Sequence, residues 1–98
     1  MDIERILIEV VAELDSATEK FPLWPTDPIH AFAILGEECG ELNKAVLQAT
    51  YEPHKSNEDE VRAEAIQVAA MSLRFLMSLN EYKYVKSGQH EQVKSESV

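Results

Sequence analysis

Carboxylate side chains recur at helical spacing in two separate stretches of this sequence. Each stretch places acidic groups three or four residues apart, so that in an α-helix they are neighbours on one face and repel one another. In chain order the residues are Glu37, Glu38, Glu41, Glu60, Glu64 and the amide residue Gln67. Where such residues are partly buried, they need a compensating charge, which makes them the first candidates for a binding site.

Both acidic groups border apolar positions. Glu38 and Glu41 flank the apolar side of their helix, and Glu64 and Gln67 share a face with Met71. Partly buried like charges are costly unless a cation neutralises them. Oxygen ligands on facing helices suit Mg²⁺ and also Mn²⁺. We therefore expect a divalent-metal site; the alternative is a solvated acidic face with incidental spacing.

Helices are expected to position these groups. The first should cover residues 3–19, where apolar residues recur at helical spacing. The second should begin at Pro28 after the N-cap Asp27, and should end at residue 50 or 51, before Pro53. These limits place the first acidic stretch in the middle of the second helix.

The third helix should follow an N-cap at Ser56 or Asn57 and reach about Leu79, with Asn80 as its C-cap. Residues 81–84 could add a short fourth helix. The predicted fold is all-α: an antiparallel bundle of three main helices plus a short C-terminal helix, forming one domain over residues 1–84. Residues 85–98, rich in Lys, Ser, Gln and Glu, are expected to be a disordered tail.

The third helix has more apolar surface than a chain of 98 residues can cover. On a helical wheel little beyond Arg62, Ala63 and Arg74 is left to face water. The single cysteine, Cys39, excludes an internal disulfide framework and is expected to be a buried core thiol. We therefore expect a homodimer or homotetramer with a core like that of a four-helix bundle. The alternative is that the first helix and the loop around Trp24 cover the third helix within one chain.

The charge balance excludes other classes of function. Acidic residues outnumber basic ones by 18 to 9, a formal net charge of -9. A nucleic-acid polymer as partner is therefore not expected, nor is a basic helix on a membrane surface. Polar residues interrupt the longest apolar stretch, residues 65–79, so no membrane span is predicted. The cytoplasm is the expected location.

The run Glu37-Glu38-Cys39-Gly40-Glu41-Leu42 resembles the E-E-x-x-E-L signature of MazG-like nucleotide pyrophosphohydrolases, an all-α superfamily. The run Glu64-Ala65-Ile66-Gln67 stands where that family has a second signature, E-x-x-D. The resemblance extends over about residues 30–79. It has one departure, because Gln67 occupies the position of the family's Asp.

The resemblance implies a hydrolase acting on acid anhydrides, which converts a (deoxy)nucleoside triphosphate and water to the monophosphate and pyrophosphate. Housecleaning of non-canonical or excess nucleotides is the role it implies. Glu38, Glu41 and Glu64 match residues that hold Mg²⁺ in such enzymes. Glu37 matches a residue that ligates metal or assists the attacking water, and Glu37 or Glu41 could remove the proton from that water.

The departure at Gln67 leaves alternatives open. Its amide oxygen could still contact Mg²⁺, but it is uncharged and cannot act as a base, and Glu60 could take over part of its role. One alternative is therefore a catalytically weakened or inactive MazG-like protein that binds nucleotide or a protein partner. A purely structural helical oligomer without metal is a third interpretation.

Four further residues are candidates for binding the nucleotide. Phe21 and Trp24 lie on a proline-stiffened segment before the second helix and could stack on a base, or could instead plug the hydrophobic core. His30, in the first turn of that helix, could contact substrate or serve in capping and packing. Lys44 lies one turn after Glu41 on the same face and could contact phosphate, or could be a solvated surface cation.

Overall fold

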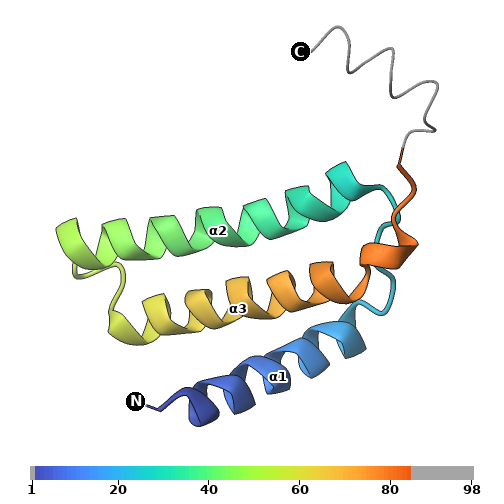
Figure 1. Ribbon diagram of the computed structural model, residues 1–98. Coiled ribbons are helices and arrows are strands. Elements are labelled where there is room, and N and C mark those ends of the chain that lie inside the picture. Colours follow the sequence, from blue (N-terminus) through green and yellow to red (C-terminus); the bar gives the residue numbers. More distant parts are fainter. Residues whose placement is uncertain (1, 85–98) are drawn as a thin grey trace, which may run out of the picture.

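The protein folds as a layer of three α-helices followed by a short 3₁₀ helix. The computed structural model describes residues 2–84. The elements in order are α1 (Ile3–Lys20), α2 (Pro28–Tyr51), α3 (Glu58–Met77) and η1 (Leu79–Glu81) (Figure 1). Within these residues there is no strand. The all-α prediction and the positions of the three main helices are confirmed.

Polar caps explain where α2 and α3 begin. Asp27 Oδ1 accepts a hydrogen bond of 2.9 Å from the backbone N–H of Ile29, and Pro28 occupies the first helical position. Asn57 Oδ1 caps α3 by accepting a 3.0 Å bond from the N–H three residues further on. Ser56 is buried and its hydroxyl has no hydrogen-bond partner, so Asn57 is the N-cap of the two candidates.

The end of α3 differs from the prediction. The helix ends at Met77 rather than near Leu79, and its C-cap is Ser78 rather than Asn80, which lies inside η1. The N–H of Ser78 bonds to the carbonyl of Phe75 at 3.3 Å. This three-residue spacing tightens the last turn, so the chain passes from α-helical into 3₁₀ geometry.

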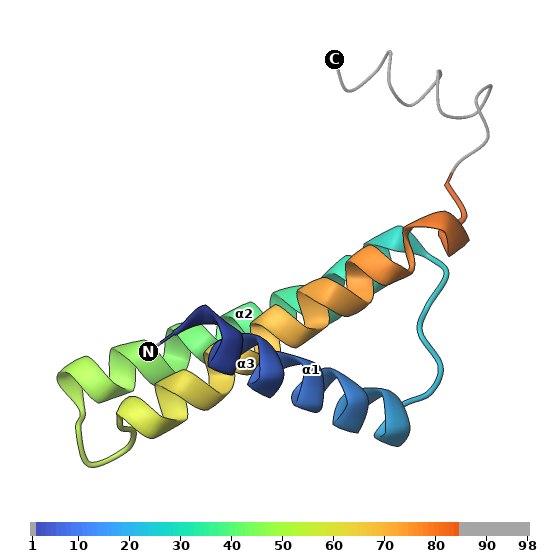
Figure 2. The same ribbon diagram turned by 60° about the horizontal axis from the view of Figure 1, so that its bottom comes forward.

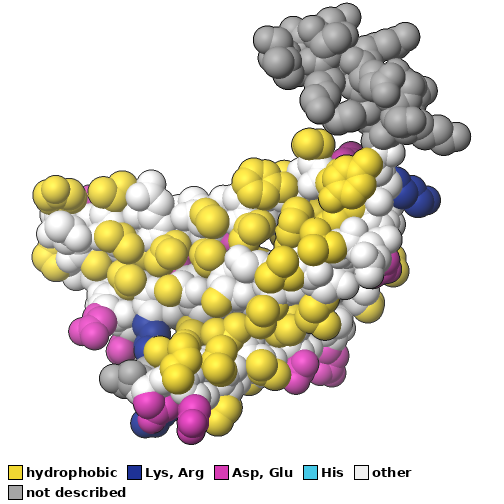
Figure 3. Space-filling model, in the orientation of Figure 1, with side chains coloured by type: hydrophobic (Ala, Val, Ile, Leu, Met, Phe, Trp, Pro, Cys, Tyr) yellow, Lys and Arg dark blue, Asp and Glu magenta, His cyan; other side chains and the backbone are white. Residues whose placement is uncertain are grey.

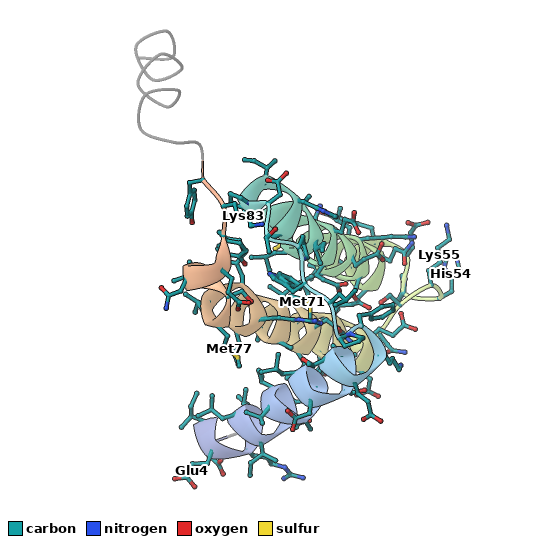
Figure 4. All side chains as sticks on the ribbon, turned by 90° about the vertical axis from the view of Figure 1, so that its right-hand side faces the viewer. Glu4, His54, Lys55, Met71, Met77 and Lys83 are labelled. Carbon is teal, nitrogen blue, oxygen red and sulfur yellow. The ribbon has the colours of Figure 1, made fainter. Side chains whose placement is uncertain are left out.

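Helix α3 is the centre of the fold. Among the described residues, α1 and α2 each pack against α3 and not against each other. The α2 and α3 helices run antiparallel along their length, whereas α1 crosses α3 obliquely (Figure 2). Val10, Ala70 and Met71 form the buried cluster between α1 and α3, and Met71 lies in the middle of the molecule (Figure 4). Partly buried side chains surround this cluster: Ile6, Leu14, Ala17, Trp24, Ile34, Leu35, Ile66, Ala69 and Leu73.

This layer leaves much apolar surface uncovered. No large side chain in the described part of the chain is fully buried. Exposed hydrophobic residues occur on all three helices, including Leu7, Phe32, Val46 and Leu76. On the face shown in Figure 3, hydrophobic side chains gather over α1, α2 and α3. The first helix and the Trp24 segment do pack against α3, as the single-chain alternative expected, but they do not enclose it.

Two expectations about burial were wrong. Cys39 was expected in the core but is exposed, because within residues 2–84 α3 is the only helix packed against α2. Arg74 was expected to face water but is only 7% exposed. The segment before α2 lies against it, so that its guanidinium donates a hydrogen bond to the carbonyl of Phe21 and stands 4.9 Å from the ring centroid of Trp24.

None of the helices in the described part of the chain has the length and apolar composition needed to cross a membrane. The tail predicted for residues 85–98 lies outside the described residues.

Candidate functional site

Glu38 on α2 lies within electrostatic range of acidic side chains on all three helices. Its pKa is raised above the ordinary value of a glutamate, first because partial burial removes water from the carboxylate. Repulsion by four other carboxylates raises this pKa further. In decreasing order of effect they are Glu64, Glu41, Glu37 and Glu13. The structure therefore brings the two acidic stretches within electrostatic range of each other and adds a residue from α1.

Helix periodicity accounts for the orientation of the acidic residues on α2. Ala31 and Ala45 are buried, and Glu38 lies about two turns from each of them, so its side chain is on the side of α2 that meets α3. Glu41 follows Phe32 by about two and a half turns and points to the opposite side of α2. The acidic side and the exposed apolar side of α2 are thus separate.

A small pocket between α2 and α3 contains several of the predicted residues. Glu41, Lys44, Glu60 and Glu64 line this pocket, whose volume is about 150 Å³. Lys44 is the one cation among its lining residues. A positive group beside carboxylates suits a ligand in which phosphate oxygens and a bound cation are adjacent. The arrangement thus combines the predicted phosphate contact with three of the predicted acidic residues.

Gln67 faces a different pocket. It lines a pocket of about 460 Å³ between α1 and α3 together with Glu9, Glu13 and Arg62. Arg62 forms an ion pair with Glu9 across this pocket. Gln67 is therefore on the α1 side of α3, whereas Glu64, one turn earlier, lines the pocket on the α2 side.

Glu13 is a candidate that sequence reasoning missed. Its negative charge helps to raise the pKa of Glu38, and its side chain lines the same pocket as Gln67. Glu13 lies three residues after the buried Val10 and directly before Leu14, so it borders an apolar stripe as Glu38 does. The same criterion, applied to the first helix, could have found it.

The donor chemistry of these residues fits Mg²⁺, but their side chains do not form a ready-made ligand set. Carboxylate oxygens are preferred ligands of Mg²⁺, at about 2.1 Å. Within residues 2–84 no group of three or more His, Cys, Asp or Glu side chains is close enough together to hold a metal ion. The repulsion acting on Glu38 extends over longer distances than coordination does. Side-chain rotation would be needed to bring the carboxylates onto one ion.

The predicted nucleotide-binding residues on the segment before α2 have different environments. Trp24 packs against the core cluster and also lines a pocket of about 380 Å³. Its indole N–H donates a 2.8 Å hydrogen bond to the hydroxyl of Tyr82. Phe21 is 69% exposed, and His30 is exposed in the first turn of α2. Trp24 thus combines packing with a position on a pocket wall, while Phe21 does not plug the core.

A comparison of the chain with family models, with curated proteins and with solved structures found no match. The resemblance to MazG-like enzymes therefore rests on the residues of the two motifs.

Proposed function

We propose that this protein is a Mg²⁺-dependent nucleoside triphosphate pyrophosphohydrolase of the MazG-like type. It would convert a (deoxy)nucleoside triphosphate and water to the monophosphate and pyrophosphate, and so remove non-canonical or excess nucleotides. The observation that carries the proposal is the meeting of acidic residues from both motifs around Glu38, whose pKa they raise. Carboxylates that repel one another in this way are neutralised by a divalent cation.

The proposal gives the acidic residues two roles. Glutamate side chains and one amide would hold Mg²⁺: Glu38, Glu41, Glu64, Glu60 and the amide oxygen of Gln67. Mn²⁺ could replace Mg²⁺ at this site. When bound, the ion supplies positive charge for the phosphate oxygens. Glu37 and Glu41 are exposed on α2 and would accept the proton of the water that attacks the α-phosphorus, with pyrophosphate as the leaving group.

Substrate contacts come from residues around this acidic centre. Lys44 shares a pocket with Glu41 and Glu64, and would contact the phosphate groups. Trp24, Phe21 and His30 would contact the base or sugar. With a net charge of -9, the chain repels a triphosphate, so binding of the substrate should depend strongly on the divalent ion.

Assembly into a homodimer or homotetramer is part of the proposal. The support for it is the exposed apolar surface of the three-helix layer, where Phe32 is 62% and Leu76 57% exposed. Contiguous apolar surface of this kind is typical of protein interfaces. A second copy packed against it would complete a core like that of a four-helix bundle.

A second candidate function is nucleotide or protein binding without turnover. Two observations favour it: the described carboxylates are not gathered into a group of three or more metal ligands, and Gln67 faces the α1 side of α3. In this case, the presence of Gln67 in place of the family's Asp would mean that the site lacks a negative charge needed for catalysis. The two candidates differ in whether pyrophosphate is released.

Pyrophosphate release tests the proposal directly. The full-length protein is assayed with a panel of NTPs and dNTPs in the presence of Mg²⁺ or Mn²⁺. We expect turnover with at least one substrate, and a loss of about 100-fold or more in Glu38→Gln and Glu64→Gln because each removes a negative oxygen ligand. Asp15→Asn, an exposed acidic residue on α1, is the control and should keep full activity.

The variant Gln67→Asp separates the two candidate functions. No turnover by the wild type together with turnover by Gln67→Asp would identify a binding protein that has lost its activity. Turnover by the wild type that survives both Glu38→Gln and Glu64→Gln would show that the site has been assigned to the wrong residues.

A further inference from the structure

A third pocket lies where α1, the segment before α2 and the end of α3 meet. Its volume is about 380 Å³. Leu14, Leu23 and Met77 contribute apolar walls, Arg74 is the one basic residue lining it, and Glu81 is the one acidic residue. No carboxylate of the proposed catalytic centre lines this pocket. Its charged residues are therefore separate from the acidic centre, although Trp24, a proposed contact for the base or sugar, also lines it.

Arg74 is a buried cation without an acidic partner among the described residues. It is 7% exposed, and within residues 2–84 its contacts are a hydrogen bond to the carbonyl of Phe21 and the ring of Trp24. A guanidinium has five N–H donors, so this single acceptor leaves most of them unused. Arg74 also lines the pocket, where a ligand could accept from these donors. A buried positive charge without an acidic partner favours the binding of an anionic ligand, which would neutralise it.

The pocket wall is held in place by hydrogen bonds within the chain. The indole N–H of Trp24 donates to the Tyr82 hydroxyl at 2.8 Å, and that hydroxyl donates to the carbonyl of Phe75 at 3.1 Å. The N–H of Lys83 donates to the carbonyl of Thr26 at 2.8 Å. These bonds tie the segment before α2 to the chain that follows α3. A ligand would therefore meet a wall that is already ordered, which lowers the entropic cost of binding.

We propose that this pocket binds a small organic oxyanion, a carboxylate or a phosphate ester on an apolar body. The free N–H groups of Arg74 would pair with the oxyanion, for which a planar guanidinium is well suited. The apolar body would lie against Leu14, Leu23 and Met77. Glu81 at the pocket repels negative charge, so a singly charged carboxylate should bind more tightly than a doubly charged phosphate ester. This proposal does not rest on the proposed hydrolytic function.

The single tryptophan of the chain, Trp24, reports on this pocket through its fluorescence. The full-length protein is titrated with cyclohexanecarboxylate, with cyclohexyl phosphate and with the neutral cyclohexanecarboxamide. We expect a saturable change with the carboxylate and an affinity at least about tenfold weaker for the amide, because the amide cannot form a charge-assisted bond. Equal responses to carboxylate and amide, or no saturation with either anion, would overturn the proposal.

Variants test the roles of the two charged residues. Arg74→Gln should weaken carboxylate binding by about tenfold or more, whereas Arg5→Gln, which removes an exposed charge from α1, should leave it unchanged. Glu81→Gln should strengthen binding by about two- to fivefold, since an exposed repulsive charge is removed. Unchanged binding in Arg74→Gln would contradict the proposal. If Arg74→Gln does not fold, unchanged or weaker binding in Glu81→Gln contradicts it instead.

Discussion

Glu38 holds its proton more tightly in the folded chain than an ordinary glutamate does, because burial and neighbouring carboxylates raise its pKa. A group whose folded pKa is raised contributes stability below its unfolded pKa, and that contribution is lost as the pH rises through the folded pKa. At neutral pH the ionised Glu38 therefore weakens the fold. A bound cation would offset the repulsion between Glu38 and its neighbours, so cation binding at this residue should also stabilise the folded chain.

The first prediction concerns Glu38→Gln. At neutral pH the variant should be more stable than the wild type by a few tenths of a kcal/mol, roughly the repulsion of one or two like-charge pairs. The gain in stability should disappear at about pH 4, because the carboxyl group of the wild type is then protonated and as uncharged as the amide of the variant. Thermal unfolding at the two pH values measures this difference. Asp15→Asn should show no comparable gain, and a less stable Glu38→Gln at neutral pH would contradict the assigned cause.

A second residue-scale prediction concerns Tyr82, which joins the segment before α2 to the end of α3. Its hydroxyl accepts from Trp24 and donates to Phe75. Tyr82→Phe should reduce the free energy of unfolding by about 1–3 kcal/mol, because it leaves the indole N–H without its partner. Urea unfolding measures the loss. Tyr84→Phe is the matched control, since Tyr84 is exposed and its hydroxyl makes no hydrogen bond within the described residues. Equal stability of the two variants would contradict the role given to Tyr82.

At the scale of elements, local chemistry explains most helix limits. Asp27 and Asn57 begin α2 and α3 as N-caps, and Pro28 is compatible only with the start of a helix. The chain after α3 also makes a contact distant in sequence, because the hydroxyl of Tyr82 accepts a hydrogen bond from the indole N–H of Trp24 and donates one to the carbonyl of Phe75. Two glycines inside α2, Gly36 and Gly40, have no packing explanation among residues 2–84, since a Cβ at either position would have none of these residues within 4 Å.

The third prediction follows from this open space. Gly40→Ala should raise the free energy of unfolding by about 1 kcal/mol, because alanine loses less backbone entropy in a helix and no described residue obstructs its methyl group. The reciprocal change Ala33→Gly, at an exposed position of α2, should lower it by about the same amount. Chemical denaturation of both variants measures the pair. A destabilised Gly40→Ala would reveal that another chain or a ligand packs closely at this glycine.

At the scale of the whole molecule, the three-helix layer has unequal sides. Its acidic residues meet around Glu38, while apolar side chains gather on the face shown in Figure 3. The periodicity of α2 separates the two, because Glu41 and Phe32 point in opposite directions. Covering the apolar side with a second copy would leave the acidic centre open to substrate.

The fourth prediction tests that assembly. Sedimentation equilibrium of the wild type should show a dimer or tetramer, and Leu76→Arg should raise the dissociation constant by about tenfold or more, because it places a charge in an apolar interface. Ile8→Arg is the control: Ile8 is 70% exposed and lies on the side of α1 away from Val10. A wild type that is monomeric at high concentration would contradict the proposed assembly.

Much of the fold could be predicted from the sequence, and less of the candidate site. Glu37, Glu38 and Glu41 lie within two turns of one helix, so their relative positions follow from local geometry alone. Which residue of another helix faces Glu38 depends on the angle and rotation at which helices pack, which no local signal specifies. Glu13 was missed for this reason. Arg74 was expected to face water because the wheel did not include the segment before α2, which lies against it.

The sequence by itself determined the three helices, the N-cap Asp27 and the two acidic stretches, because caps, prolines and helical periodicity act over a few residues. Only the tertiary structure decided that α3 is central, that Glu13 joins the acidic residues around Glu38, and that Arg74 lies against Trp24 beside a pocket. These features depend on contacts between residues that are distant in the chain. Such contacts are set by how the apolar side chains of α1, α2 and α3 pack together, and the spacing of residues along one helix does not specify that packing.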